Sequence, residues 1–311
     1  MAVVHGGAVT GSDHGLFGGI EAGGTKWLCV VGRAPGDIRA ELRVPTTTPA
    51  ATLEAVVSFF RQQQAALGPI AGLGIGSFGP VDLHRGSPRY GFITATPKPG
   101  WADTDIVGPL TRALGVPVAF DTDVNAAALG ERHYGAAQGL DTFLYLTVGT
   151  GIGGGGLAGG RVLHGLVHPE MGHVRVPHDL SADPFPGICP FHGDCLEGLA
   201  SGPAMEARWG RPADALPADH PGWALEARYL ALALHGFVCT LSPQRIVIGG
   251  GVMEQSHLLP RIRLELGRLL NGYIQSPVLT GDLAHYVVAP ALGGRAGVLG
   301  ALWMAERAVT A

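Results

Sequence analysis

The sequence predicts an α/β protein of two domains. The chain has 311 residues, which corresponds to about two domains of ordinary size. Apolar segments with strand-like and helix-like spacing alternate along it, as they do in α/β folds. Each half also opens with two apolar segments joined by a glycine-rich turn, which predicts a hairpin at the start of each domain.

The N-terminal half begins at Leu16, because residues 1–15 have no apolar period and are expected to form a disordered extension. A helix is predicted at 51–67, where apolar residues recur at helical spacing up to Gly68 and Pro69. Before that helix we expect a hairpin at 16–32 and a strand at 39–47. After it we expect a strand with a Gly-Pro loop at 70–82, a helix at 105–115, a strand at 117–124 and a helix at 125–137.

The C-terminal half opens with the second hairpin. We expect that hairpin at 142–165, a long amphipathic helix at 224–241 and a strand with a glycine turn at 245–253. A helix at 257–273, a strand at 285–291 and a closing helix at 294–309 are expected to follow. We therefore place an N-terminal domain at 16–124 and a larger C-terminal domain at 125–311. The closing helix could pack back on the N-terminal domain.

Composition excludes several classes of partner. The net charge of −4 argues against a nucleic-acid or anionic-membrane partner, and no apolar run reaches the roughly 18 residues of a membrane span. The first residues do not resemble a signal peptide, and few cysteines suit a reducing cytoplasm. Cys29 and Cys239 lie in apolar runs and are predicted to be small buried residues.

Four potential metal ligands gather in one segment of the C-terminal half. Cys189, His192 and Cys195 are spaced three residues apart, and His173 lies one loop upstream. Two thiolates and two imidazoles complete the tetrahedral coordination of Zn²⁺, with no position left open for a substrate. The segment therefore predicts a structural zinc site.

Two alternatives to this ligand set remain open at the level of sequence. His178 lies between the two halves of the segment and could replace one ligand, and Cys189 and Cys195 could form a disulfide bond instead. The acidic residues Glu170 and Glu197 bracket the segment. A metal here would hold two carboxylates in place, which suggests the scaffold of a site.

Three glycine-rich turns each follow a strand-like segment, at 21–26, 149–156 and 249–251. Glycine allows backbone N–H groups to surround a phosphate, and threonine hydroxyls add donors. A plain tight turn is the alternative for any one of them.

Two better-known phosphate-binding patterns fit this chain poorly. Lys26 ends a GGTK segment like that of a P-loop, but the earlier glycine of that pattern is missing. Gly149, Gly151 and Gly154 match G-x-G-x-x-G, but a dinucleotide-binding fold needs a helix to begin at this turn. The chain continues instead into GGLAGGR, which disfavours a helix.

Asp123 is the candidate general base. It lies at the end of an apolar strand, beside Asp121 and just before Asn125. Phosphoryl transfer requires positioned phosphates, Mg²⁺ and one carboxylate that accepts the hydroxyl proton. The alternative is that Asp123 only caps the helix that follows it.

The chain resembles the ROK sugar kinases from about Leu16 to its C-terminus. The resemblance lies in eight segments in family order: GGIEAGGTK, GSFGPVD, YGFITATPKPGW, FDTDVNAAALGE, LTVGTGIGGG, HPEMGH, CPFHGDCLEGLASGP and IVIGGGV. It implies a two-domain actin-like ATPase (ribonuclease H-like) fold with a cleft between the domains.

Within that family the chain looks like the bacterial zinc-containing fructokinases. His192 stands where most members have a cysteine, and Glu21 stands where most have an aspartate, which leaves open how Mg²⁺ would be held there. Thr122 stands where the family's glucokinases have an asparagine. The fructokinase branch resembles this chain at His192 and Glu21, whereas Thr122 weakens an assignment to glucose.

The resemblance implies a role for each matching residue. Asp123 would be the general base. The sugar would be bound by Glu170, His173 and Glu197, with Lys98 and Trp101 nearby, although Lys98 could also be a solvated loop residue. His173 would bind zinc through one ring nitrogen and face the sugar with the other. ATP would be bound by Gly23, Gly24, Thr25, Lys26, Thr147, Gly149, Thr150, Gly151, Gly249, Gly250 and Gly251.

The resemblance implies ATP-dependent phosphorylation of D-fructose to fructose 6-phosphate, with ATP, Mg²⁺ and a structural Zn²⁺ as cofactors. A glucokinase or mannokinase of the same family, or a non-catalytic sugar sensor, is the alternative. A transcriptional repressor of this family would carry a helix-turn-helix domain, for which residues 1–15 show no pattern. Family members suggest a cytoplasmic homodimer.

Overall fold

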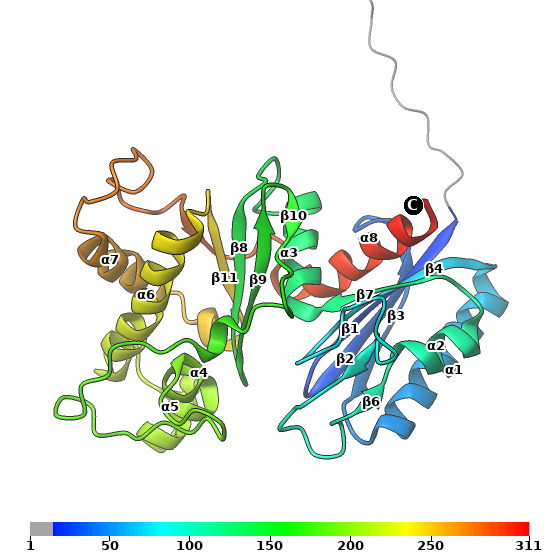
Figure 1. Ribbon diagram of the computed structural model, residues 1–311, viewed down its shortest axis with the longest axis horizontal. Coiled ribbons are helices and arrows are strands. Elements are labelled where there is room, and N and C mark those ends of the chain that lie inside the picture. The colour runs from blue at the N-terminus through cyan, green and yellow to red at the C-terminus, as the bar shows by residue number, and fades with distance from the viewer. Residues whose placement is uncertain (1–14, 311) are drawn as a thin grey trace, which may run out of the picture.

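Two five-stranded sheets, each built around a hairpin, form the frame of the protein (Figure 1). This computed structural model describes residues 15–310. The extension that we expect at 1–15 therefore lies outside the described residues, apart from Gly15.

The first sheet carries the first hairpin. Its strands are β1 (Leu16–Ala22), β2 (Lys26–Gly32), β3 (Ile38–Pro45), β4 (Ile70–Ser77) and β7 (Val118–Thr122). Their order is β3-β2-β1-β4-β7, with β1 antiparallel to β2 and parallel to β4. Helices α1 (Pro49–Leu67) and α2 (Val107–Leu114) cover one face, and a small sheet of β5 (Phe92–Ile93) and β6 (Thr104–Asp105) lies beside them.

The second sheet repeats the pattern. Its strands are β8 (Phe143–Val148), β9 (Ile152–Ala158), β10 (Arg161–Val162), β11 (Ile246–Gly249) and β12 (Val287–Val288), in the order β10-β9-β8-β11-β12. β8 is antiparallel to β9 and parallel to β11. Both glycine hairpins therefore lie in the middle of a sheet, where their turns are fixed by paired strands on both sides.

The remaining helices of the C-terminal half pack on the outer face of the second sheet (Figure 1). They are α4 (Leu196–Ala200), α5 (Gly202–Trp209), α6 (Gly222–Leu241) and α7 (Leu258–Leu270), with 3₁₀ turns η1 (Met171–His173), η2 (Ala213–Ala215), η3 (Gly251–Glu254) and η4 (Gly293–Arg295). The apolar face of α6 packs on α7 and α4 in the largest hydrophobic core.

Helices α3 (Asp123–Tyr134) and α8 (Ala296–Thr310) lie between the two sheets and pack on each other (Figure 1). α8 also packs on β1 and β4 of the first sheet, while α3 also packs on β8 and β9 of the second. The closing helix thus returns to the N-terminal half. The residue limits of the two domains, 16–124 and 125–311, stay a prediction.

Glycines make this close helix contact possible. A Cβ at Gly300 of α8 would overlap the carbonyl of Ala126 in α3, and one at Gly74 of β4 would overlap the carbonyl of Ala301 in α8. Only a residue without a side chain allows backbones to approach so closely.

Most predicted elements are present, and their ends differ by a few residues. The last helix of the N-terminal half was predicted to open at Asn125, but α3 starts two residues earlier at Asp123. The strand predicted at 285–291 is only two residues long, and the short helices α4 and α5 were not predicted. Short elements carry too little periodicity to be recognised in the sequence.

Two expectations about α6 need correction. Cys239 was predicted to be buried, but it lies on the exposed side of this helix. By length and composition α6 could also span a membrane, although no such run was recognised in the sequence. Half of the apolar window is buried inside the protein, which is typical of the core helix of a globular domain.

Candidate active site and metal cluster

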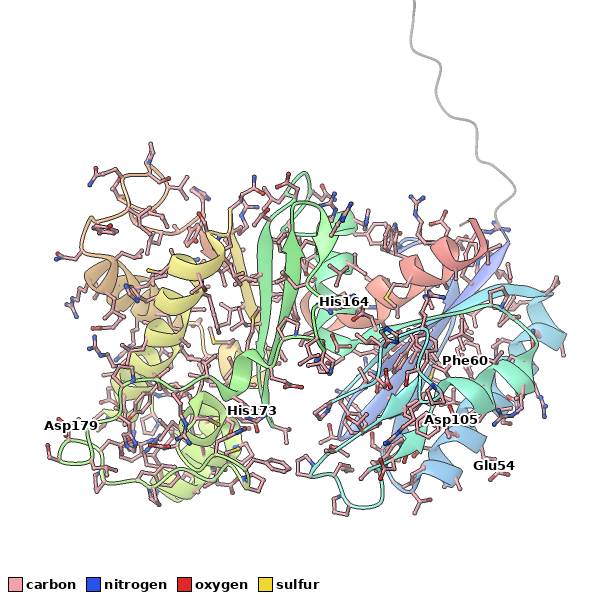
Figure 2. All side chains as sticks on the ribbon, in the orientation of Figure 1. Glu54, Phe60, Asp105, His164, His173 and Asp179 are labelled. Atoms are coloured by element: carbon pink, nitrogen blue, oxygen red, sulfur yellow. The ribbon has the colours of Figure 1, made fainter. Side chains whose placement is uncertain are left out.

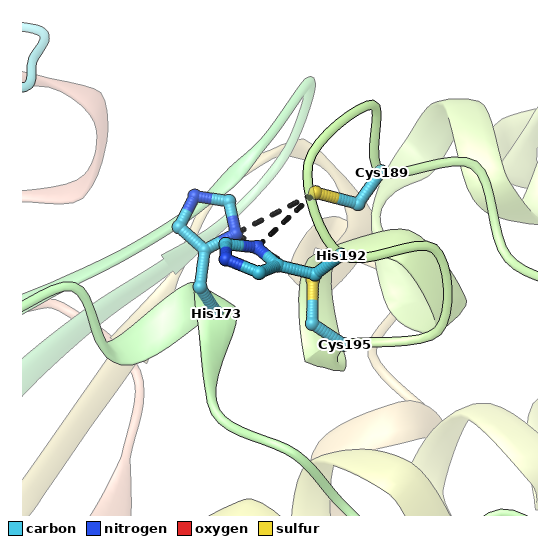
Figure 3. Close-up of side chains that lie close together, drawn as sticks. All are labelled: His173, Cys189, His192 and Cys195. Carbon is cyan, nitrogen blue, oxygen red and sulfur yellow. Dashed lines mark hydrogen bonds between the residues drawn. The ribbon is translucent and has the colours of Figure 1, made fainter. Parts of the chain in front are cut away.

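His173, Cys189, His192 and Cys195 come together as one cluster (Figure 3). The Nδ1 atom of His173 lies 3.5 Å from Cys195 Sγ and 3.8 Å from Cys189 Sγ, and Cys189 Sγ lies 3.6 Å from His192 Nδ1. A tetrahedral Zn²⁺ with ordinary bond lengths would separate its sulfur and nitrogen ligands by about 3.6 Å. The four donors therefore fit a zinc ion.

The structure excludes both alternatives to this ligand set, a disulfide bond and a role of His178 as a ligand. All four cysteines are free thiols. His178 points away from the cluster: its Nε2 lies 3.0 Å from the carbonyl of Asp183 and its Nδ1 lies 3.3 Å from Asp194 Oδ2. His178 thus fixes the same loop through hydrogen bonds.

Glu197 joins the metal cluster to the second glycine hairpin. It stands in the first turn of α4, two residues after the ligand Cys195. Its Oε2 accepts a hydrogen bond of 2.9 Å from the amide of Ile152, the first residue of β9. A Cβ at Gly151 would lie 2.7 Å from the same oxygen, so this glycine makes room for the carboxylate.

The first hairpin turn is closed by its own backbone and by the residue that follows β3. The amide of Gly23 donates to the carbonyl of Lys26, and the hydroxyl of Thr46 donates to the carbonyl of Gly23 at 2.7 Å. A Cβ at Gly24 would meet no atom within 4 Å. The tip of this turn, from Gly24 through the exposed Lys26, is therefore open to a ligand.

The second and third turns support each other. Thr147 of β8 pairs with Gly249, the last residue of β11. Gly250 has a φ of 98°, and a Cβ there would lie 2.6 Å from the amide nitrogen of Val148. Gly149 and Thr150 form the hairpin turn, where the amide of Gly149 donates to the carbonyl of Gly151 at 2.9 Å.

A cavity of about 450 Å³ brings residues of both halves together. It is lined from the first sheet by Glu21 and Lys26, and from α3 by Asp123. The second sheet contributes Thr147 and the whole third turn, Gly249, Gly250 and Gly251. The size suits a small ligand, and glycine backbone around its wall lets a phosphate approach closely.

Asp123 occupies the first position of α3 and is not its cap. Thr122 is the N-cap, since its hydroxyl accepts from the amide of Asn125 at 3.1 Å. Burial raises the pKa of Asp123 to about 6, although the amide of Val124 donates to its carboxylate at 2.8 Å and opposes this shift. The capping alternative is therefore wrong, and the carboxylate is left to face the cavity.

Glu21 faces the same cavity and is tied to α8. Its Oε2 accepts from the amide of Val298 at 3.1 Å, and a Cβ at Gly297 would lie 2.6 Å from its carboxyl carbon. Burial, and then the neighbouring charge of Asp123, raise its pKa to about 7. Two close carboxyls in one cavity favour a bound cation there.

Residues 17–308 match the family model described as "ROK family". The chain belongs to the ROK family. It is 44% identical to a protein named fructokinase from Zymomonas mobilis, with 94% of this chain and 97% of the relative covered. It is 40% identical to a fructokinase of Pediococcus pentosaceus, with 94% and 99% covered.

Solved ROK structures resemble this one over nearly their whole length. A ROK hexokinase from Thermus thermophilus has a TM-score of 0.74 at 31% identity, with 95% of this chain and 99% of that chain covered. A ROK family glucokinase from Streptomyces griseus, solved with glucose and AMPPNP, has a TM-score of 0.73 at 27% identity, covering 94% of this chain and 100% of that one. The predicted actin-like ATPase fold of this ROK protein is thereby confirmed.

Among the acceptor residues that the ROK resemblance implies, Glu170 lies near enough to Glu197 and Asp123 for their charges to act on it. Burial raises the pKa of Glu170 to about 7, and the charges of Glu197 and then Asp123 add to the effect. His173 follows Glu170 by three residues, and its amide donates to the carbonyl of Glu170 at 3.0 Å. With Nδ1 toward the thiols, Nε2 of His173 has no partner among residues 15–310.

Trp101 offers no surface to a ligand, and its place near the sugar pocket stays a prediction. Trp101 is fully buried in the core of the N-terminal half, where its ring lies 5.7 Å from Trp27 and its Nε1 donates to the carbonyl of Thr47. An apolar ring in a loop can serve the core as well as a ligand, and the sequence does not separate the two. Lys98 lies partly exposed on the same loop, and its role stays a prediction.

A second set of residues around the ROK site was not predicted. Asp121 Oδ1 accepts from the side-chain amide of Asn125 at 2.8 Å and lies 3.2 Å from Nε2 of His164. The side-chain oxygen of Asn125, Oδ1, accepts from the amide of Gly156 at 3.2 Å. This network fixes the start of α3 against β9, and its only sequence signal was the pair of polar residues flanking Asp123.

Proposed function

We propose that this ROK protein is an ATP-dependent fructokinase, which transfers the γ-phosphoryl group of ATP to the 6-hydroxyl of D-fructose. Relatives named fructokinase at 40% and 44% identity support the acceptor. The observation that carries the proposal is the shared cavity, because it places Asp123 beside Lys26 and the turn at 249–251.

Asp123 accepts the proton of the attacking hydroxyl. The sugar oxygen then forms a bond to the γ-phosphorus while the bond to the bridging oxygen breaks, and ADP leaves. A pKa of about 6 keeps the carboxylate ionised at neutral pH, yet basic enough to hold the proton during transfer.

The acceptor sugar is bound by Glu170, His173 and Glu197. Carboxylates accept hydrogen bonds from sugar hydroxyls, and the free Nε2 of His173 offers a third polar group. These side chains come from η1 and α4, which flank the metal cluster. Lys98 is the fourth candidate, on the loop of the opposite half.

ATP lies along the glycine turns of both sheets. The β- and γ-phosphates face Gly23, Gly24, Thr25 and Lys26 on one side, and Thr147, Gly149, Thr150 and Gly151 on the other. Gly249, Gly250 and Gly251 face the nucleoside. Mg²⁺, when bound, would neutralise charge on the phosphates, and Glu21, which lines the same cavity, would supply a carboxylate that fits it.

The four-residue cluster holds a structural Zn²⁺. Its donors are two thiols and two imidazoles, a set that zinc prefers. The ion when bound cross-links the loop of 173–195, and thereby fixes Glu170 and Glu197 on either side of it. The free thiols fit a cytoplasmic protein.

We further propose that the protein is a homodimer. Light scattering should then give a mass in solution near twice the chain mass of 32.1 kDa.

Glucose or mannose is the second candidate for the acceptor, since a similar solved structure is a glucokinase bound to glucose. A non-catalytic sugar sensor is disfavoured by the half-buried carboxylate of Asp123, which lines the cavity beside the phosphate turns. A panel of hexoses assayed with ATP, through coupled detection of ADP, tests all three. We expect the highest kcat/KM for D-fructose. A tenfold preference for glucose over fructose would overturn the assignment of fructose as the acceptor. Absence of turnover with every hexose would overturn the assignment as a sugar kinase.

A further inference from the structure

His168 lies between the two halves of the protein and next to the acceptor site. It stands two residues before Glu170, on the loop that leads from β10 to η1, and its side chain is only 4% exposed. His164 (Figure 2) lies on the same loop, and its Nε2 lies 3.0 Å from Oδ2 of Asp121 in the first sheet. The loop is therefore anchored to the N-terminal half at two histidines.

The partners of His168 determine where its proton lies. The amide of Val81 donates to Nε2 at 3.0 Å. A backbone N–H can only donate, so Nε2 carries no proton and the neutral ring must hold its proton on Nδ1. Burial also lowers the pKa of His168, which favours this neutral form. The ring is thus a donor at Nδ1 alone.

The Nδ1 proton faces the candidate sugar ligand. Nδ1 lies 3.4 Å from the carbonyl oxygen of Pro169 and 3.5 Å from Oε1 of Glu170. Among residues 15–310, no other side-chain donor reaches the Glu170 carboxylate, which instead has the negative groups Glu197 and Asp123 nearby. Contacts of this length in a site without substrate commonly shorten when substrate binds.

The other side of the ring is held rigidly. Val81 is buried and bridges to Ile93, and the amide of Thr94 donates to the carbonyl of Pro80 at 2.8 Å. Gly79 allows close packing, since a Cβ there would lie 3.4 Å from Cε1 of His168. The amide that selects the tautomer is thus fixed in the N-terminal half.

We infer that His168 is a positioning residue: the Val81 amide fixes its Nδ1–H tautomer, and Nδ1–H orients the Glu170 carboxylate toward the sugar. The inference rests on the proposed role of Glu170 as a sugar ligand. It makes the geometry of the acceptor site depend on residues 79–81 of the opposite half.

Two near-isosteric variants separate this role from a structural one. In His168→Asn the amide nitrogen can take the place of Nδ1, so it keeps the donor to Glu170 and loses the acceptor for Val81. In His168→Gln the amide oxygen can take the place of Nε2, so it keeps the acceptor for Val81 and loses the donor. A merely structural histidine would be replaced better by Gln.

The test measures KM for D-fructose and for ATP in both variants, after melting temperatures confirm folding. We expect His168→Gln to raise the KM for fructose about tenfold and His168→Asn to raise it less than threefold, with the KM for ATP unchanged in both. In a Glu170→Gln background, His168→Gln should have no further effect. A larger rise in the KM for fructose in His168→Asn than in His168→Gln would overturn the inference.

A second measurement does not depend on substrate. The ¹⁵N spectrum of the histidine rings in the wild-type protein should show the Nδ1–H tautomer for His168 at neutral pH, assigned by its loss in His168→Gln. An Nε2–H tautomer or an imidazolium would overturn the inference. If the wild-type protein phosphorylates no hexose, the proposed function fails, while this spectrum still decides the orientation of His168.

Discussion

Asp123 illustrates how one residue can be costly for folding and useful for chemistry. Its carboxylate starts α3, faces a cavity and is largely removed from water, so burial raises its pKa to about 6. An ionised group that is desolvated without a salt-bridge partner destabilises the folded state. The same desolvation makes it a stronger base than an exposed aspartate.

Asp123→Asn should reduce kcat by about 10²–10⁴-fold, the usual contribution of a general base, since the amide cannot accept the proton. It should also raise stability by about 1–2 kcal/mol at pH 7, because the buried charge is removed. Steady-state kinetics and urea unfolding measure both. The control is Asp219→Asn, an exposed aspartate, and a near-normal kcat for Asp123→Asn would contradict the assignment.

The pH dependence follows from the direction of the Asp123 shift. The base acts only when ionised, so kcat should fall as the pH drops below about 6. Stability depends on pH in the opposite direction. The folded pKa lies above the unfolded value of 3.8, so the contribution of this group to stability falls as the pH rises from about 4 to 6 and is constant above that range. A flat kcat from pH 5 to 8 would exclude Asp123 as the base.

At the scale of the element, the third glycine turn depends on one backbone conformation. Gly250 has a φ of 98° and its Cβ position is occupied by Val148, whereas Gly251 has no atom within 4 Å of its Cβ position. We expect Gly250→Ala to cost about 2 kcal/mol or more and to raise the KM for ATP. Gly251→Ala is the matched control, with stability changed by less than about 0.5 kcal/mol. Equal losses of stability in the two variants, by urea unfolding, would contradict this view of the turn.

The metal cluster makes a prediction about the loop of 173–195. Cys195→Ser should lose bound zinc, measured by atomic absorption, and lower the melting temperature, because a missing ligand removes the cross-link. Cys239→Ser changes an exposed thiol outside the cluster and should do neither. A strong chelator should affect the wild-type protein and the Cys239→Ser variant equally. Full thermal stability after complete metal removal would argue against a structural zinc.

At the scale of the whole molecule, the contact between α3 and α8 connects the catalytic helix to the first sheet. Gly300 touches the backbone of Ala126, so Gly300→Ala should cost more than about 2 kcal/mol and should lower kcat, since it displaces α3 and with it Asp123. The control is Gly236 in α6, which is exposed and has no neighbour at its Cβ position. Gly236→Ala should stabilise by about 0.5–1 kcal/mol. A tolerated Gly300→Ala would show that the two helices do not pack this closely in solution.

The sequence by itself determined the elements whose signal is local. The strand–glycine–strand segments, the long amphipathic helices and the ligand spacing of Cys189, His192 and Cys195 each lie within one stretch of chain, and all were predicted. Only the tertiary structure decided which distant residues these segments contact. Glu21 accepts a hydrogen bond from the amide of Val298, 277 residues away, Trp101 packs in the core of the N-terminal half, and His168 accepts from the amide of Val81 across the two halves. The physical reason is that periodicity and turn chemistry act between near neighbours in the chain, whereas burial, pKa and hydrogen-bond partners depend on groups that only folding brings together.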